Sequence, residues 1–250
     1  MLIAIGLATS GTRVHAQVRG ALEVGVSVDS LWRNGAMRAV GVRVTVAAAS
    51  SQQLLSFYLD SPVAVAVDTS DVGALGAFGH WMVMNRFADR RVTSWTNARR
   101  PVPAGESTPR FVVRGEGVFG LVQYWTAFDQ EPVEPDSMPM EKPDSVPTQD
   151  TTVRTNGPSG WIIGIVAAPP VEAANAAASR VRDAITTLCT FGWISPSGIC
   201  NSLQAKASPH REQLNALAHE LDAQRGKHLS EGAYWMLVDA VEHAQASLQP

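Results

Sequence analysis

The stretch ALEVGVSVDSLWRNGAMRAVGVRVTVAAA, residues 21–49, decides the fold of the first half of the chain. Apolar residues, mostly valine, recur at every second position on both sides of an Asn34-Gly35 pair. Alternation with a period of two is typical of a strand with one buried face. Because Asn-Gly favours a tight hairpin turn, the sequence predicts two antiparallel strands joined there.

Short strand-like runs continue as far as residue 168, and turn signals such as Asp60-Ser61-Pro62 and the Pro/Gly-rich residues 101–108 separate them. The runs are LLSFYL (54–59), PVAVAV (62–67), RVTSW (91–95), RFVVRG (110–115), LVQYWTAF (121–128) and WIIGIV (161–166). Many short strands at this spacing are typical of an antiparallel β-sandwich rather than a parallel sheet. We therefore assign residues 17–168 to a β-sandwich domain.

Residues 131–150, EPVEPDSMPMEKPDSVPTQD, differ in composition from the strands around them. Five prolines and six acidic residues leave too little apolar surface to form a core. The carboxylates also lack the spacing of a calcium-binding loop. The composition therefore predicts a disordered acidic loop that interrupts the sandwich.

The hydrophobic period changes from two to that of a helix after Pro169-Pro170, which we take as a domain boundary. Residues 171–250 are predicted to form a small helical bundle. Ser208 and Ser230 are the expected N-caps of its last two helices, and Gly226 is the expected C-cap between them. The overall fold class is thus an N-terminal antiparallel sandwich and a C-terminal helical bundle in separate domains.

The N-terminus indicates export. An apolar run, residues 2–8, precedes small and polar residues, and Val14 and Ala16 stand at the −3 and −1 positions of a signal peptidase site before Gln17. Residues 1–16 are therefore predicted to be a signal peptide; the alternative is a buried first strand. No segment has the eighteen apolar residues of a membrane span, so we expect a periplasmic or secreted protein.

The chain has two cysteines, Cys189 and Cys200. Their spacing is not that of a CxxC redox motif, and no histidine lies nearby to complete a zinc site. In an oxidising compartment such a pair is predicted to form one disulfide. Free buried thiols are the alternative.

Several classes of chemistry find little support in the sequence. The GEGVFG stretch, residues 115–120, matches a dinucleotide-binding pattern, but a strand follows it where a helix is required, so we expect a glycine-rich hairpin. The histidines form no HExxH motif, and the net charge of −3 with mixed signs argues against a nucleic-acid surface. We expect no metal, no cofactor and no catalytic residues.

Aromatic residues are the remaining candidates for ligand contacts. Tyr124 and Trp125 are neighbours on a predicted strand, so their side chains must point to opposite faces of the sheet. We expect one of the two to be exposed, where it can stack on a sugar ring. The alternative is that both fill the core of the sandwich.

The C-terminal part resembles the FIMAH-type helical module of secreted bacterial proteins over roughly residues 180–245. The residues that carry the resemblance are Gly198, Ile199, Asn201, Ser202, Leu203, Lys206, Gln213, Leu214, Ala216, Gln224, Gly226 and Lys227. The stretch between Lys206 and Gln213 is shorter than in that family. The resemblance implies an accessory or interaction module, and the N-terminal part resembles immunoglobulin or fibronectin sandwiches only in general terms.

Together these features predict a non-enzymatic exported protein that contacts a protein or a surface polymer in the envelope or outside the cell. The alternative is a carbohydrate-binding sandwich that uses exposed Trp or Tyr side chains. An unrecognised hydrolase is a third class, which would require a concave pocket with converging polar groups.

Overall fold

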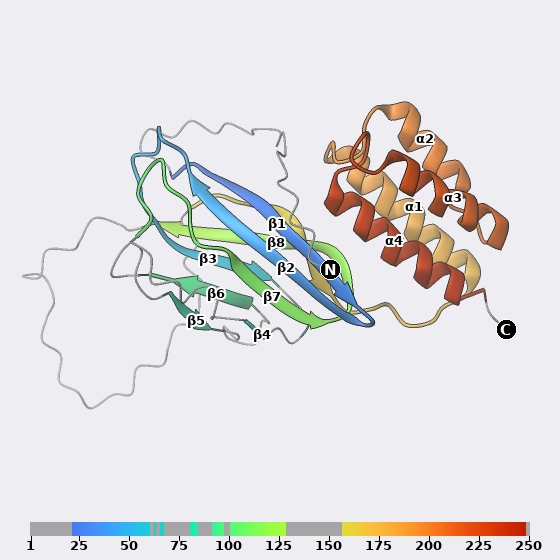
Figure 1. Ribbon diagram of the computed structural model, residues 1–250, viewed down its shortest axis with the longest axis horizontal. Coiled ribbons are helices and arrows are strands. Elements are labelled where there is room, and N and C mark those ends of the chain that lie inside the picture. The colour runs from blue at the N-terminus through green and yellow to red at the C-terminus, as the bar shows by residue number, and fades with distance from the viewer. Residues whose placement is uncertain are drawn as a thin grey trace, which may run out of the picture.

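The computed structural model describes residues 22–60, 63, 66–67, 81–84, 92–97, 101–128 and 157–248. The predicted signal peptide, residues 1–16, and the predicted acidic loop, residues 131–150, lie outside the described residues. Figure 1 shows two β-sheets packed face to face, with a group of helices at one end. Antiparallel sheets followed by C-terminal helices are the architecture that the hydrophobic periods predict.

The first sheet contains β1 (Val24–Asn34), β2 (Met37–Val46), β7 (Phe111–Glu116) and β4 (Ala66–Val67), in the order β1-β2-β7-β4. All of its pairings are antiparallel. Asn34 pairs with Met37, and Gly35 adopts a φ of 57° in the turn, which confirms the predicted hairpin. The alternating valines of β2 form the inner face of this sheet: Val40, Val42, Val44 and Val46 are fully buried.

The second sheet contains β5 (Met82–Met84), β6 (Val92–Thr96), β3 (Leu54–Asp60), β8 (Val118–Phe128) and β9 (Ser159–Val166), in that order. It too is antiparallel. Between the two sheets, the Phe57 and Trp95 rings of the second sheet lie 5.9 and 4.9 Å from the Phe111 ring of the first. These aromatic rings fill the centre of the sandwich.

The glycine-rich stretch 115–120 is not a hairpin, contrary to the prediction. Strand β7 pairs with β2 in the first sheet, whereas β8 pairs with β3 and β9 in the second, so the chain passes between sheets at Gly117. A Cβ on Gly117 would lie 2.2 Å from the carbonyl oxygen of Val166. Glycine is therefore required because the backbone of β9 approaches this corner too closely for any side chain.

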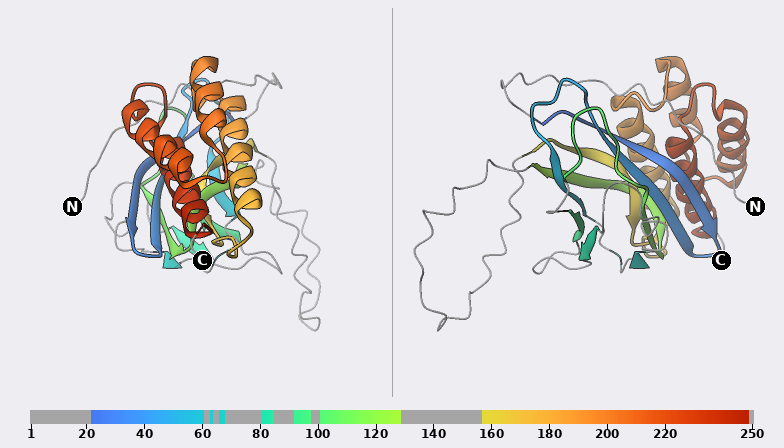
Figure 2. Two further views of the ribbon diagram at one scale, coloured as in Figure 1. Left: turned by 90° about the vertical axis from the view of Figure 1, so that its right-hand side faces the viewer. Right: turned by 60° about the vertical axis from the view of Figure 1, so that its left-hand side comes forward.

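The helical part contains α1 (Ala174–Thr190), α2 (Ser197–Lys206), α3 (Arg211–Gln224) and α4 (Glu231–Ala246). Figure 2 shows these helices gathered at one end of the sheets. Ser230 caps α4 as predicted, because its Oγ accepts a hydrogen bond of 3.2 Å from the backbone N–H of Ala233. Gly226 follows the C-terminus of α3 with a φ of 70°.

The predicted N-cap at Ser208 is wrong. Helix α3 begins at Arg211, and its N-cap position is His210, with no side-chain hydrogen bond. The backbone N–H of Ser208 bonds instead to the carbonyl of Lys206, which turns the chain once more before the helix starts. Pro209 therefore lies in this bend and not in the first turn of a helix.

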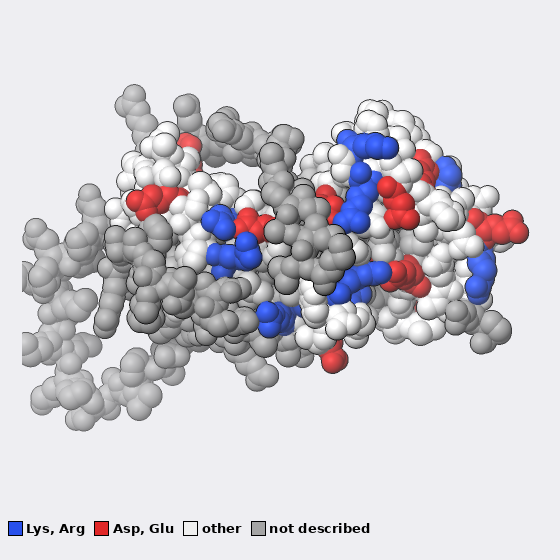
Figure 3. All heavy atoms as spheres, in the orientation of Figure 1, with Lys and Arg blue, Asp and Glu red and all other residues white. Residues whose placement is uncertain are grey.

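Charged side chains of both signs are interspersed on the visible surface (Figure 3). Ion pairs among the described residues include Arg180 with Glu172 and Lys206 with Glu220, each at 2.8 Å. Among the described residues, the face drawn in Figure 3 thus shows no extended patch of side chains that all carry the same charge.

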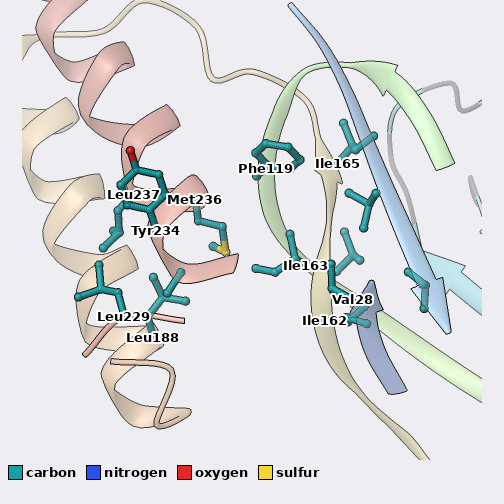
Figure 4. Close-up of a cluster of buried hydrophobic side chains, with 14 of the residues drawn as sticks. Val28, Phe119, Ile162, Ile163, Ile165, Leu188, Leu229, Tyr234, Met236 and Leu237 are labelled. Atoms are coloured by element: carbon teal, nitrogen blue, oxygen red, sulfur yellow. The ribbon is translucent and has the colours of Figure 1, made fainter. Parts of the chain in front are cut away.

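Helix α4 attaches the helical part to the second sheet. A Cβ on Gly232 would lie only 2.7 Å from Cγ1 of Ile163, so the first turn of α4 lies directly on strand β9. Met236, one turn later, faces Ile163 across the same interface (Figure 4). The buried side chains of the sandwich and of the helices form one continuous hydrophobic cluster.

The predicted boundary residues Pro169 and Pro170 lie in the connection between the end of β9 and the start of α1. His243 on α4 hydrogen-bonds the carbonyl of Pro170 at 3.2 Å and so holds this connection against the helices. Whether residues 171–250 fold alone stays a prediction, because the helices share an apolar contact with the sheet.

Candidate functional site

The register of β8 and β9 defines a candidate binding face. Trp125 lies opposite Ser159, and Gln123 lies opposite Trp161. Directly opposed residues of an antiparallel pair share a face, so these side chains lie on the same side of the sheet. This is the outer side, because Tyr124, between Gln123 and Trp125, points toward the other sheet. We call these residues the β8–β9 face: Gln123, Trp125, Ser159 and Trp161.

Tyr124, one of the two aromatic residues singled out from the sequence, packs inward. Its ring lies 5.9 Å from the fully buried Phe57 ring. On the neighbouring strand, Gly160 leaves room for it, because a Cβ there would come within 2.8 Å of the Tyr124 hydroxyl. Burial raises the pKa of Tyr124 above its ordinary value by disfavouring the phenolate. Trp125 is thus the outward-facing member of the pair, but it is half-buried, so neither residue is exposed as the sequence predicted.

Trp161 is the most exposed aromatic side chain among the described residues, at 51%. The sequence placed this residue on a strand but gave no reason to single it out. Two tertiary facts accompany its exposure: β9 is an edge strand, and the first turn of α4 lies over Ile163, two residues further on. Trp161 therefore lies at the border between the covered and the open part of the sheet, with the half-buried Trp125 beside it.

The β8–β9 face combines aromatic rings with neutral polar groups. An indole offers a flat apolar surface and one N–H donor, and the neighbouring side chains contribute an amide and a hydroxyl. No residue of this face is charged. The arrangement is suited to stacking on a ligand that has apolar faces and hydroxyl or amide edges.

A second exposed apolar patch lies on the outer side of the first sheet. Trp32 is 41% exposed and Met37 is 36% exposed. Because Trp32 pairs with Ala39 and Asn34 with Met37, the two apolar side chains are diagonal neighbours at the end of the β1–β2 hairpin. Arg33, between them, points to the other side, where it pairs with Glu242 and stacks on Trp235.

Cys189 and Cys200 form a disulfide with an S–S distance of 2.08 Å. It joins the last turn of α1 to the first turns of α2. In the part of the chain that the structure describes, no group of three or more His, Cys, Asp or Glu side chains is placed to hold a metal ion. Within the same residues, no helix is both long and apolar enough to cross a membrane.

No family model matches the chain, and no curated protein matches it. A structural match is the crystal structure of an uncharacterized protein from Nocardia farcinica that reveals an immunoglobulin-like fold. The match has 16% sequence identity and a TM-score of 0.31, and it covers 46% of this chain and 90% of that protein. The resemblance of the helices to the FIMAH-type module therefore stays a prediction.

Proposed function

We propose that this chain is a non-enzymatic binding protein of an exported, oxidising compartment, and that it contacts a surface polysaccharide through the β8–β9 face. Three features support the proposal: the disulfide suits that compartment, the helical part leaves this face uncovered around Trp161, and the exposed groups there are aromatic and neutral. The helical part acts in this proposal as an accessory module that holds β9 in place.

The observation that carries the proposal is the exposure of Trp161 beside Trp125. A tryptophan that leaves half of its surface in water gives up much of the free energy that burial supplies to a core residue. An exposed aromatic side chain beside a second, half-buried one is a surface feature from which binding sites are built. Sugar rings have one flat apolar face, so they stack on indole while their hydroxyls reach the amide of Gln123 and the hydroxyl of Ser159.

Binding to insoluble and soluble polysaccharides tests this proposal. Trp161→Ala should lower the affinity at least tenfold, because a central aromatic contact contributes about 2 kcal/mol. Trp125→Ala should have a smaller effect, since this side chain is half-buried. Trp32→Ala is the matched control, because Trp32 is similarly exposed on the other sheet. Unchanged binding in Trp161→Ala would overturn the assignment of the site.

A protein partner is the second candidate, and the Trp32–Met37 patch favours it. This patch lies at the end of the long β1–β2 hairpin, where an apolar side chain can insert into a partner. A photo-crosslinker at position 32 that captured one envelope protein, with capture lost in Met37→Ser, would support it. Loss of polysaccharide binding in Trp161→Ala, together with no crosslink at position 32, would favour polysaccharide binding through the β8–β9 face.

A further inference from the structure

A shallow cleft of about 440 Å³ lies over the disulfide of the helical part. The end of α1, the connection between α1 and α2, and the first half of α2 form its walls. Its volume falls in the range of small-ligand sites. The cleft is separate from the β8–β9 face, because none of the residues of that face lines it.

The lining of this cleft has an unusual composition. All ten lining residues are uncharged, although 17% of the chain consists of Asp, Glu, Lys and Arg. Six of them carry a hydroxyl or a primary amide: Thr186, Thr190, Ser195, Ser197, Asn201 and Gln204. The side chains of Ser195, Ser197 and Asn201 are exposed, so they present their hydrogen-bonding groups to solvent at the cleft.

The walls of the cleft are held in position before any ligand arrives. The Cys189–Cys200 disulfide ties one wall to the other, with 6.2 Å between the two Cα atoms. A second link joins the same two walls: the amide of Gln204 on α2 donates a hydrogen bond of 3.0 Å to the hydroxyl of Thr186 on α1. The backbone N–H of Ser195 bonds to the carbonyl of His228, which anchors the connection to the next loop. A preorganised site loses less entropy when it binds a ligand.

We propose that this cleft is a second binding site, which takes one or two residues of a neutral saccharide. A charged ligand would find no counter-charge among the lining side chains. An apolar ligand would leave the hydroxyls and amides of the cleft without partners. A saccharide offers alternating donors and acceptors that match those groups, and its apolar face can contact the disulfide at the floor.

The cleft takes the same class of ligand as the β8–β9 face of the proposed function, but it binds that ligand through different residues. Two sites on one folded chain allow a single polymer chain to be held twice, which raises the overall affinity without any new contact. The helical part then contributes directly to binding in addition to supporting β9.

Amide-detected NMR titration of the oxidised full chain tests the second site. The probes are hexasaccharides of glucose and of N-acetylglucosamine, at up to about 10 mM, where ligands with a Kd near 1 mM are largely bound. We expect the largest shifts at Gly192 and at the side-chain amides of Asn201 and Gln204. Asn201→Ala should weaken binding at the cleft about five- to tenfold, which is the loss of one hydrogen bond.

Asn215→Ala is the matched control, because Asn215 is an exposed amide on α3 outside the cleft and pairs with Gln245. Trp161→Ala should leave the shifts at Asn201 unchanged, so failure at the β8–β9 face and failure at the cleft are distinguishable. Unmoved signals at Gly192, Asn201 and Gln204 with every hexasaccharide would overturn the proposal. Stronger shifts there with a sulfated polysaccharide or with a neutral hexapeptide would overturn it as well.

Discussion

The side chains of Arg38, on strand β2, and Asp239, on α4, form a buried ion pair across 201 positions of sequence. Nε and Nη2 of Arg38 donate hydrogen bonds of 3.0 and 2.8 Å to the two carboxylate oxygens of Asp239. The same carboxylate accepts a hydrogen bond of 2.8 Å from the backbone N–H of Phe119. Asp239 thus connects the last helix to both sheets at once.

Asp239→Ala should destabilise the protein by about 3–5 kcal/mol, because it leaves the buried Arg38 guanidinium and the Phe119 N–H without their acceptor. Urea unfolding followed by tryptophan fluorescence measures the loss. Glu242→Ala is the control: it removes a surface pair with Arg33 and should cost less than about 1 kcal/mol. Equal small losses in the two variants would show that the pair does not hold the helices to the sheets.

Ser230 and Ser208 give a matched test of helix capping. Ser230→Ala removes the acceptor of the Ala233 N–H and should cost about 1 kcal/mol. Ser208→Ala should leave stability unchanged or raise it, because the Ser208 Oγ is buried without a hydrogen-bond partner among the described residues. Thermal melts of both variants measure the difference. A comparable loss at Ser208 would mean that α3 begins earlier than the structure shows.

Gly117 and Gly198 separate two roles of glycine. Gly117→Ala should destabilise by about 2–3 kcal/mol, because its Cβ collides with the backbone of Val166 and the residue has a φ of 155°. Gly198→Ala, in the first turn of α2, meets nothing within 4 Å and should be neutral or stabilising by up to about 1 kcal/mol. Unfolding of both variants in a chemical denaturant measures the change in their free energy of unfolding. A tolerated alanine at position 117 would contradict the sharp passage between the two sheets.

The sequence alone predicted the parts of the fold that depend on residues close to one another along the chain. The valines of β2 alternate because one face of the strand is buried, and Ser230 precedes α4 because its hydroxyl accepts a hydrogen bond from the free N–H of Ala233. The passage of the chain at Gly117 was not predictable in this way. A hairpin and a change of sheet place the same glycines between two strands, and only the pairing partners of β7 and β8 distinguish them.

The candidate sites depended still more on tertiary structure. Alternation showed that Tyr124 and Trp125 point to opposite faces, but not which face is the core. The exposure of Trp161 depends on where α4 begins over β9, and the residues around position 161 in the sequence carry no information about this. Asp239 is a polar residue on a helix, and its burial is explained only by its ion pair with Arg38, far away in sequence. The disulfide could be predicted from the sequence because the chain contains only two cysteines.

The inward position of Tyr124 predicts a difference at alkaline pH. Because burial raises its pKa, the folded state resists ionisation. The stabilisation of the neutral phenol is complete below the ordinary tyrosine pKa of about 10 and is lost as the pH rises toward the raised pKa of the folded state. Tyr124→Phe should therefore lose less stability than the wild type above about pH 10. Urea midpoints from pH 7 upward test this, and parallel curves would place the hydroxyl of Tyr124 in water.

Removing the disulfide tests both the stability of the helical part and the rigidity of the cleft. The bond closes a loop with a sequence separation of 11, so Cys189→Ser with Cys200→Ser should cost about 2–3 kcal/mol, mainly through the greater freedom of the unfolded chain. Reduction of the wild type should lower the melting temperature by the same amount as the double substitution. Under conditions where the double variant stays folded, saccharide shifts at Asn201 should weaken while those at Trp161 persist, because only the cleft has walls joined by the bond. Equal weakening at both places would mean that the disulfide acts on the whole molecule and not on the cleft.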